Sequence, residues 1–156
     1  MSNVTIVSFD EEYSSIFYEL NKLWIEESWL LEESDKFDLL NPKESIIDKG
    51  GEIFFALIDG NVVGTVAMIR STNRIYELAK MTVEINYRGN GVANKLMDQC
   101  LNYAMNNNAQ QIYLITNDTL VIARNLYDKY GFKEVKLDSD KYLRGNVKMV
   151  LNLAEE

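Results

Sequence analysis

The sequence predicts an α+β fold built on a mixed sheet of about seven strands and flanked by about four helices. Between residues 53 and 83, three apolar stretches are separated by short turns, which is typical of an antiparallel meander. After residue 88, helical and strand patterns alternate, which requires crossovers and therefore some parallel pairing. The 156 residues contain no linker-like segment and no internal repeat, so we expect one domain over residues 1–156.

The first third of the chain predicts one strand and two helices. Residues 1–7 end in alternating apolar residues, as a short strand would. Segment 10–24 begins with three acidic residues and continues with apolar residues spaced i, i+3, i+4 and i+7, which predicts an amphipathic helix. Residues 29–31 break that pattern and predict a turn or a helix connection. Residues 41–44, Asn-Pro-Lys-Glu, predict a helix start with Asn as its N-cap, and the glycines at 50–51 predict its end.

The remainder predicts alternating strands and helices. In order, we expect strands at 53–58, 62–69 and 75–83, a helix with apolar residues at i+4 spacing from Val92 to Ala104, a strand at 111–116, a helix at 120–130, and closing strands at 132–137 and 147–153. The terminal strand alternates apolar and polar residues, so we expect it to be available for pairing in a possible homodimer.

The composition excludes several kinds of chemistry. The chain has no His and one Cys, so it contains no Ser-His-Asp or Cys-His pair, no His-ligated zinc site and no internal disulfide, and we expect no metal. With 24 acidic against 16 basic residues, the net charge of −8 disfavours nucleic acid as a partner. The absence of an export signal and of a long apolar run predicts a cytoplasmic protein without a membrane partner.

A glycine-containing turn at residues 88–93, Arg-Gly-Asn-Gly-Val-Ala, precedes the long amphipathic helix. Such a turn directs the first helical amides outward, and glycine lets an anion approach the backbone closely. The Arg88 guanidinium can add to the binding of a phosphate. The turn is neither a P-loop, because no Gly-Lys-Ser/Thr follows, nor a dinucleotide fingerprint, because the third glycine is absent. On its own, the glycine pair is equally compatible with an anion site and with a helix start that holds no ligand.

This turn resembles the signature Arg/Gln-x-x-Gly-x-Gly/Ala of the GNAT superfamily of acyl-CoA-dependent N-acyltransferases, matched by Arg88, Gly91 and Ala93. Residues 123–132 resemble the Ala-x-x-Leu-Tyr-x-Lys-x-Gly-Phe helix-to-strand junction of that superfamily, and Thr116-Asn117 followed by Leu120 fits one of its branches. These motifs cover residues 77–132. The N-terminal third resembles the superfamily in the order of its elements alone.

The resemblance implies a sheet that splays between its fourth and fifth strands, with acetyl-CoA as co-substrate in the cleft. The pyrophosphate would lie on amides of Arg88, Gly89, Asn90, Gly91, Val92 and Ala93. The pantetheine arm would run along Met81, Thr82 and Val83 and would contact Asn117. An extended arm that carries amides suits such a place, because separating strands expose backbone donors and acceptors.

Tyr127 and Glu77 are the catalytic candidates. A phenol stays protonated at neutral pH and can donate to a departing thiolate, and the resembled family often uses a Tyr at the position of Tyr127 as its acid. The alternative is that its ring only packs. Glu77 is the single carboxylate among Ile75, Ala79, Met81 and Val83, which we expect on one strand face, where burial would prepare it to accept a proton. Alternatively, Glu77 pairs with a Lys or Arg, or a bulge turns it to solvent.

The sequence contains few features that predict the acceptor site. The resemblance places it near the connection of the first two helices, which points to Trp24, Glu27, Trp29 and Tyr142. Aromatic rings beside acids suit a cationic amine, although for each Trp taken alone a place in the core is the favoured interpretation. Cys100 shares its helix face with Leu96 and Ala104, so we expect an inert buried thiol.

The function predicted from these features is acetyl transfer from acetyl-CoA to a primary amine of a small molecule by direct attack in a ternary complex. The alternatives are a protein or peptide N-acetyltransferase and a non-catalytic CoA-binding sensor module. Tyr127 together with Glu77 favours the enzyme, because a sensor needs neither. A protein acetyltransferase would need an open acidic groove, and a closed pocket over residues 24–31 would argue against it.

Overall fold

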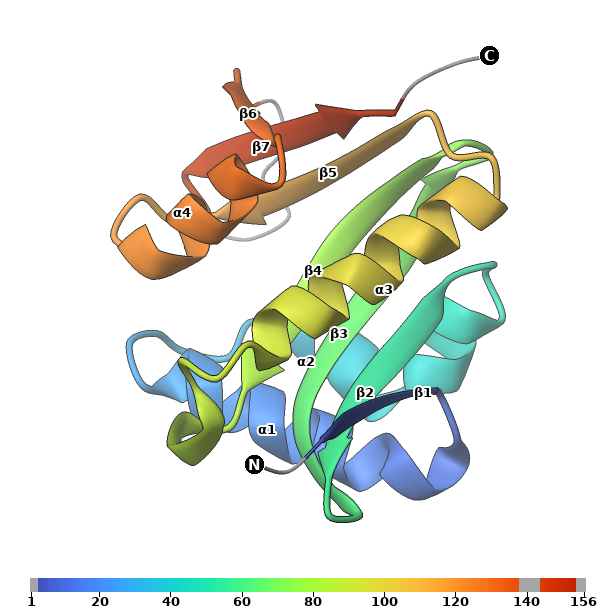
Figure 1. The fold of residues 1–156 in the computed structure, drawn as a ribbon, viewed down its shortest axis with the longest axis vertical. Helices are drawn as coiled ribbons and strands as arrows, with labels where there is room; N and C mark the ends of the chain where they lie inside the picture. The colour runs from blue at the N-terminus through green and yellow to red at the C-terminus, as the bar shows by residue number, and fades with distance from the viewer. Residues whose placement is uncertain (1–2, 138–143, 154–156) are drawn as a thin grey trace.

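The computed structural model describes residues 3–137 and 144–153, which form a seven-stranded sheet (Figure 1). Its spatial order is β1-β2-β3-β4-β5-β7-β6, and every neighbouring pair is antiparallel except β4–β5. The mixed, mostly antiparallel sheet is therefore confirmed. The strands are β1 (Val4–Ser8), β2 (Glu52–Ile58), β3 (Asn61–Thr72), β4 (Ile75–Val83), β5 (Gln111–Thr116), β6 (Lys133–Val135) and β7 (Val147–Asn152).

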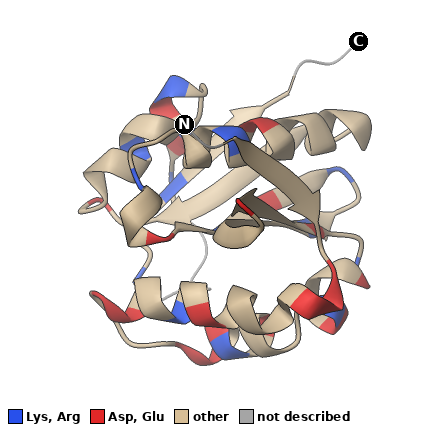
Figure 2. Cartoon of the chain, turned by 60° about the horizontal axis from the view of Figure 1, so that its bottom comes forward, with Lys and Arg blue, Asp and Glu red and all other residues tan. Residues whose placement is uncertain are grey.

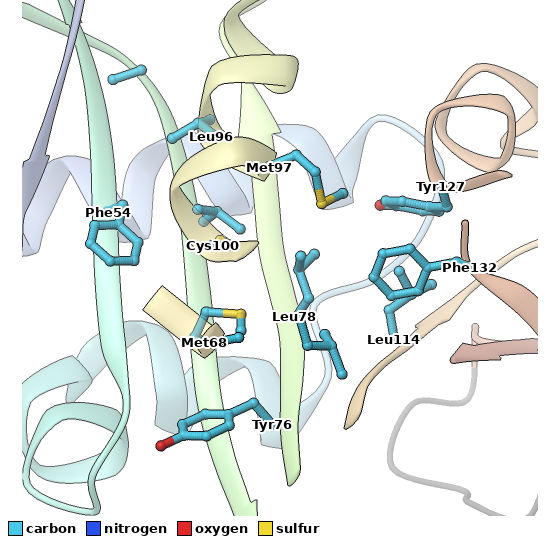
Figure 3. Close-up of a cluster of buried hydrophobic side chains, with 14 of the residues drawn as sticks. Phe54, Met68, Tyr76, Leu78, Leu96, Met97, Cys100, Leu114, Tyr127 and Phe132 are labelled. Atoms are coloured by element: carbon cyan, nitrogen blue, oxygen red, sulfur yellow. The ribbon is translucent and has the colours of Figure 1, made fainter. Parts of the chain in front are cut away.

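Helices cover both faces of this sheet. On one face lie α1 (Ser14–Glu26) and α2 (Glu33–Leu40), and on the other lie α3 (Val92–Asn106) and α4 (Val121–Lys129). Side chains alternate along β2 and so contribute to two cores. Phe55 packs in the core on the α1 side. The preceding Phe54 packs in the core on the α3 side (Figure 3). Figure 2 shows the three layers, with acidic residues frequent in the lower, α1–α2 layer. No helix in these described ranges is long and apolar enough to cross a membrane.

The connection between the first strand and the meander differs from the prediction. Asp10 caps a short 3₁₀ turn, Glu11–Tyr13, so α1 begins at Ser14. Helix α2 was not predicted, because only Asp35 and Leu39 of that helix are buried, which leaves no apolar stripe to detect. The Asn41 side chain closes α2 by donating to the Phe37 carbonyl at 3.1 Å instead of capping the next helix. The residues after Pro42 form one π-helical turn, Lys43–Ile47, rather than a regular helix.

The sheet opens between β4 and β5, as the resemblance implied. The two strands pair over three positions only, Ile75–Glu77 with Gln111–Tyr113, and then diverge (Figure 1). Beyond Glu77, β3 is the one described strand that pairs with β4, while β5 continues beside β7. The separation leaves one edge of β4 facing a cleft.

A bulge in β4 changes the expected alternation of side chains between the two faces of the sheet. Ala79 is opposite Ala67, but Thr82 is opposite Thr65, so β4 contains one extra residue, and Lys80 has a φ of 57°. An extra residue moves all later side chains to the other face. Glu77 therefore lies on the α1 face, opposite Ile69, whereas Val83 packs in the α3-side core. The prediction that both residues share a face was wrong.

The terminal strand β7 does not have the free edge expected for dimer pairing. It is antiparallel to β5 on one side and to β6 on the other. Among the described strands, the edges of the sheet are β1 and β6. Pairing of two β7 strands in a homodimer would require β6 to leave its place beside residues 148–150.

Candidate active site

A cavity of about 790 Å³ occupies the place where β4 and β5 separate. Its volume lies within the usual range for small-molecule sites. Its walls come from α1, β4, the turn before α3, the end of β5, α4 and residues 144–145. The cavity therefore reaches from the helical start of α3 on one side to the α1 layer on the other.

The turn before α3 supplies a row of backbone N–H donors. Gly89 and Gly91 both have a φ of 82°, a left-handed conformation that glycine adopts without strain. The six consecutive N–H groups from Gly89 to Asn94 make no hydrogen bond to any residue that the structure describes. Neighbouring free amides at a helix N-terminus form a cradle for an anion.

Arg88 is fixed at the base of this cradle. Its Nε donates to the Val83 carbonyl at 2.8 Å, and its Nη2 lies 3.5 Å from a carboxylate oxygen of Glu27. Glu27 was predicted to bind the acceptor, but it is not among the residues that line the cavity. Its contact with Arg88 places it instead beside the anion cradle.

The free edge of β4 supplies a second row of backbone groups. Met81, Thr82 and Val83 all line the cavity, beyond the point where β5 stops pairing with β4. Backbone donors and acceptors on such an edge can bind an extended chain that carries amides. The structure thus brings these three predicted residues together with Arg88, Gly89, Gly91, Val92 and Ala93 in one cavity wall, and Asn90 lies in the same turn.

Tyr127 faces the cavity from α4. Its side chain is buried, its ring lies 6.0 Å from that of Phe132, and its hydroxyl points toward Met97 (Figure 3). Burial raises the pKa of Tyr127 to about 12. The hydroxyl has no hydrogen-bond partner within the described ranges 3–137 and 144–153. Tyr127 therefore packs in the α3-side core, lines the cavity, and keeps its hydroxyl protonated at neutral pH.

Glu77 lines the same cavity from the α1 face of β4. It is 2% exposed, which excludes the alternative that a bulge turns it to solvent. Tyr127 belongs to the α3-side core, so the two candidates approach the cavity from opposite faces of the sheet. This arrangement places a phenol and a carboxylate on opposite faces of the sheet, both in the wall of the cavity.

The other predicted residues have mixed outcomes. Trp24 and Trp29 line the cavity with ring centroids 5.9 Å apart. Asn117 also lines it, but its Nδ2 donates to the Arg144 carbonyl at 2.7 Å and its Oδ1 accepts from the Thr119 amide at 2.9 Å. Tyr142 lies outside the described residues. Cys100 is fully buried, which raises the pKa of its thiol, in agreement with an inert core residue.

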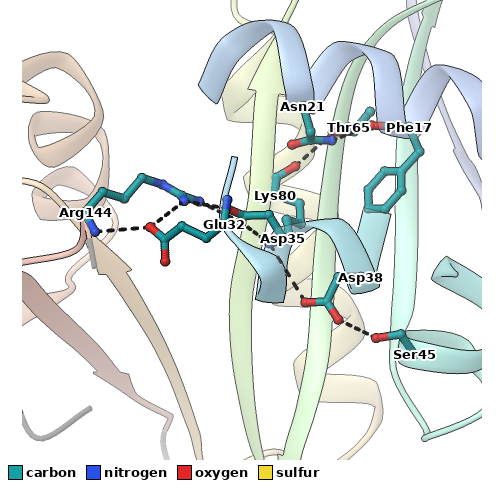
Figure 4. A network of polar contacts seen from close by, with 9 residues as sticks. All are labelled: Phe17, Asn21, Glu32, Asp35, Asp38, Ser45, Thr65, Lys80 and Arg144. Atoms are coloured by element: carbon teal, nitrogen blue, oxygen red, sulfur yellow. Dashed lines mark hydrogen bonds and ion pairs between the residues drawn. The ribbon is translucent and has the colours of Figure 1, made fainter. Parts of the chain in front are cut away.

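A buried ion network, which no sequence pattern predicted, borders the α1 side of the cavity (Figure 4). Arg144 binds Asp35 with two hydrogen bonds, Nη1 to Oδ2 at 2.6 Å and Nη2 to Oδ1 at 2.9 Å. Lys80 Nζ lies 3.1 Å from Asp35 and 3.9 Å from Asp38. Burial opposes ionisation of Asp35, but the Arg144 hydrogen bonds and the charges of both cations outweigh it and lower the pKa of Asp35 to about 2.

Polar contacts from β3 and α1 fix the bulge that carries Lys80. The Thr65 hydroxyl donates to the Lys80 carbonyl at 2.8 Å, and it accepts from Asn21 Nδ2 at 3.1 Å. Asn21, Thr65 and Asp35 are all buried. Across the described ranges, no group of three or more His, Cys, Asp or Glu side chains is placed to hold a metal ion.

Comparisons with known proteins agree with this geometry. A model of the acetyltransferase (GNAT) family matches residues 9–132. N-acetylaspartate synthetase from Xenopus tropicalis is 35% identical over 107 residues, which are 67% of this chain and 40% of that protein. The Rattus norvegicus protein of that name is 33% identical over 120 residues, 76% of this chain and 39% of that protein. The chain thus spans about two fifths of the length of these curated relatives.

Solved structures show the same fold. An acetyltransferase of the GNAT family from Staphylococcus aureus Mu50 superimposes with a TM-score of 0.87 at 26% identity, covering 97% of this chain and 100% of that one. A GNAT family acetyltransferase from Elizabethkingia anophelis with acetyl-CoA bound has a TM-score of 0.72 at 16% identity, over 97% and 99% of the two chains. With its splayed sheet, its glycine turn and a family match over most of its length, this chain belongs to the GNAT acetyltransferase family.

Proposed function

We propose that the protein transfers an acetyl group from acetyl-CoA to a primary amine of a small molecule. The observation that carries this proposal is the run of free amides from Gly89 to Asn94, which opens onto a cavity shared by Tyr127 and Glu77. The amides suit the diphosphate of acetyl-CoA, and the two side chains suit amine acylation. Membership of the GNAT family supports the same function.

The amide cradle offers enough energy to hold a diphosphate on a protein of net charge −8. A hydrogen bond to a charged group contributes about 1.5–3 kcal/mol, and the helix dipole adds about 0.3–1 kcal/mol. Repulsion from distant surface charges is largely screened beyond about 10 Å at 0.1 M salt. The pantetheine arm would then extend along the free edge of Met81, Thr82 and Val83 toward Tyr127.

The chemistry needs a neutral amine and a proton for the leaving group. The amine nitrogen attacks the thioester carbonyl to form the C–N bond, and the C–S bond breaks as the tetrahedral intermediate collapses. Tyr127 donates its proton to the departing sulfur, giving CoA thiol. Glu77, directly or through water, accepts the proton that the amine releases, and solvent returns a proton to Tyr127. Holding amine and thioester together in the cavity removes much of the remaining barrier.

A thiol-release assay with acetyl-CoA and a panel of amines tests this function. The panel should include aspartate, because the curated relatives are named N-acetylaspartate synthetases, together with simple monoamines, diamines and a short peptide. Acetyl, propionyl and succinyl donors would define the acyl preference. We expect thiol release with at least one small amine. Tight CoA binding without thiol release for any amine, and without an effect of Tyr127→Phe, would identify a non-catalytic sensor instead.

A further inference from the structure

We propose that Arg144 closes the end of the cavity that Trp24 and Trp29 line, here called the acceptor end, and thereby restricts the acceptor to small amines. This inference rests on the proposed function and makes it more specific. Arg144 acts here as a specificity-determining residue. It does not take part in the proton transfers assigned to Tyr127 and Glu77.

The first observation is that Arg144 bridges the two halves of the splayed sheet. It is held in the C-terminal half, where Asn117 donates to its carbonyl at 2.7 Å and the nearby Asn146 accepts from the Asp118 amide at 3.0 Å. Its guanidinium reaches α2 in the N-terminal half, where it binds Asp35 and also contacts Glu32 at 3.1 Å (Figure 4). Since β4 and β5 pair at only three positions, this contact spans the part of the cleft that the sheet leaves open.

The second observation is that the bridge is rigid. Asp35 is 0% exposed and accepts two parallel hydrogen bonds from the guanidinium, a geometry that fixes the plane as well as the position of the side chain. Asp35 is anchored in turn by Lys80 on the β4 bulge and by the Glu32 amide, which donates to it at 3.0 Å. An exposed, singly bonded side chain would yield to a large acceptor, whereas the Arg144 guanidinium binds both Asp35 and Glu32, and Lys80 of β4 holds Asp35 in place.

The third observation is that Arg144 separates two cavities. It lines the main cavity and also a neighbouring cavity of about 400 Å³, bordered by Leu30, Glu32 and Asn146. Trp29 and Asn117 line both spaces as well. Trp29, Asn117 and Arg144 therefore mark the boundary between the acceptor end and the neighbouring, more open pocket, and they form the proposed partition. With the guanidinium removed, the two spaces would join into a longer channel able to hold an extended acceptor.

The experiment compares two acceptors that present the same amine, a small one accepted by the wild type and the same amine carrying a three-residue peptide extension. We measure kcat/KM for both in the wild type, Arg144→Ala, Arg144→Lys and Trp29→Ala. The matched control is Arg124→Ala, which removes a 2.8 Å ion pair with Glu134 elsewhere in the C-terminal half. Circular dichroism and thermal unfolding check that each variant is folded.

We expect Arg144→Ala to raise the ratio of extended to small acceptor by about tenfold or more, the scale at which pocket shape discriminates. The KM for acetyl-CoA should stay within about threefold, and Arg144→Lys should keep part of the wild-type selectivity because a cation can still pair with Asp35. Trp29→Ala widens the same partition without removing the ion pair and should shift the ratio in the same direction. Arg124→Ala should leave the ratio unchanged.

The outcomes separate this inference from the proposed function. An unchanged ratio in folded Arg144→Ala and Trp29→Ala, in an enzyme active on the small amine, overturns the partition and leaves the acetyltransferase standing. A wild type that prefers the extended acceptor overturns it as well. If Arg144→Ala does not fold, Trp29→Ala alone decides. An absence of thiol release with every acceptor defeats the proposed function, and the partition with it.

Discussion

Gly91→Ala tests whether the backbone of the turn before α3 holds the diphosphate. Gly91 has a φ of 82°, and a Cβ built on it meets no heavy atom within 4 Å. The substitution therefore adds backbone strain without a steric clash. Gly60, in the turn between β2 and β3, offers a matched control, because its φ is 80° and a Cβ there also meets nothing within 4 Å. Gly60 does not line the cavity.

The size of the effect follows from the left-handed conformation. This backbone conformation costs a residue with a Cβ about 1–2 kcal/mol of conformational free energy. In Gly60→Ala this cost appears in full as a loss of unfolding free energy. In Gly91→Ala the free turn can relax, and binding must then restore the strained conformation. Since about 1.4 kcal/mol corresponds to a factor of ten, the affinity for CoA should fall by about 5- to 30-fold.

Isothermal titration calorimetry with CoA and urea unfolding of both variants measure the two effects. We expect weaker CoA binding in Gly91→Ala alone and a loss of stability in Gly60→Ala. If both variants bind CoA as the wild type does, while Gly60→Ala shows the expected loss of stability, the amides from Gly89 to Asn94 do not hold the diphosphate. The proposed acetyl-CoA site would then lose its main support.

Two further predictions concern single side chains. Tyr127→Phe should lower kcat by about 100-fold or more, because the proposed proton donor is lost. The KM for acetyl-CoA should change by less than about threefold, because the ring contact with Phe132 remains. Since the pKa of Tyr127 is about 12, wild-type activity should show no decline from ionisation of Tyr127 up to about pH 10. Asp35 has a folded pKa of about 2, below its ordinary 3.8, so it stabilises the fold above about pH 4 and loses that contribution, about 2 kcal/mol, as the pH falls from about 4 to about 2. Urea unfolding across this range should show the slope in the wild type and a smaller one in Asp35→Asn, and identical slopes would contradict the assignment.

The meander, the helices α3 and α4 and the glycine turn could be predicted because each is specified by contiguous residues. The β4 strand, Ile75–Val83, and the β5 strand, Gln111–Thr116, have the predicted bounds. For these elements, periodicity or turn chemistry within one segment determines the local structure. Tyr127 could be named as a catalytic candidate because the motif around it, residues 123–132, resembles the helix-to-strand junction of the GNAT superfamily.

The acceptor end could not be predicted because its parts meet only after folding. Asp35 and Lys80 are 45 residues apart, and Asp35 and Arg144 are 109 apart. The single local signal was the capping box at the start of α2, where Asp35 accepts from the Glu32 amide. The bulge at Lys80 depends on its partner strand, since Thr65 fixes the bulged carbonyl. The periodicity of one strand cannot reveal a bulge, because a bulge is defined by the pairing of that strand with its neighbour.

The dependence of CoA binding on salt should show whether backbone amides or side-chain cations hold the diphosphate. Backbone amides from Gly89 to Asn94 provide most of the proposed diphosphate site, and its one cation among the described residues, Arg88, lies 3.5 Å from Glu27. Salt screens long-range repulsion between CoA and a protein of charge −8, but it scarcely weakens short bonds to amides. Raising NaCl from about 0.05 to about 0.3 M should therefore leave the Kd for CoA within about twofold or lower it. A site built from surface Lys and Arg side chains would respond in the opposite way, and a Kd about tenfold higher at the upper salt concentration would show that side-chain cations, rather than the turn, bind the phosphates.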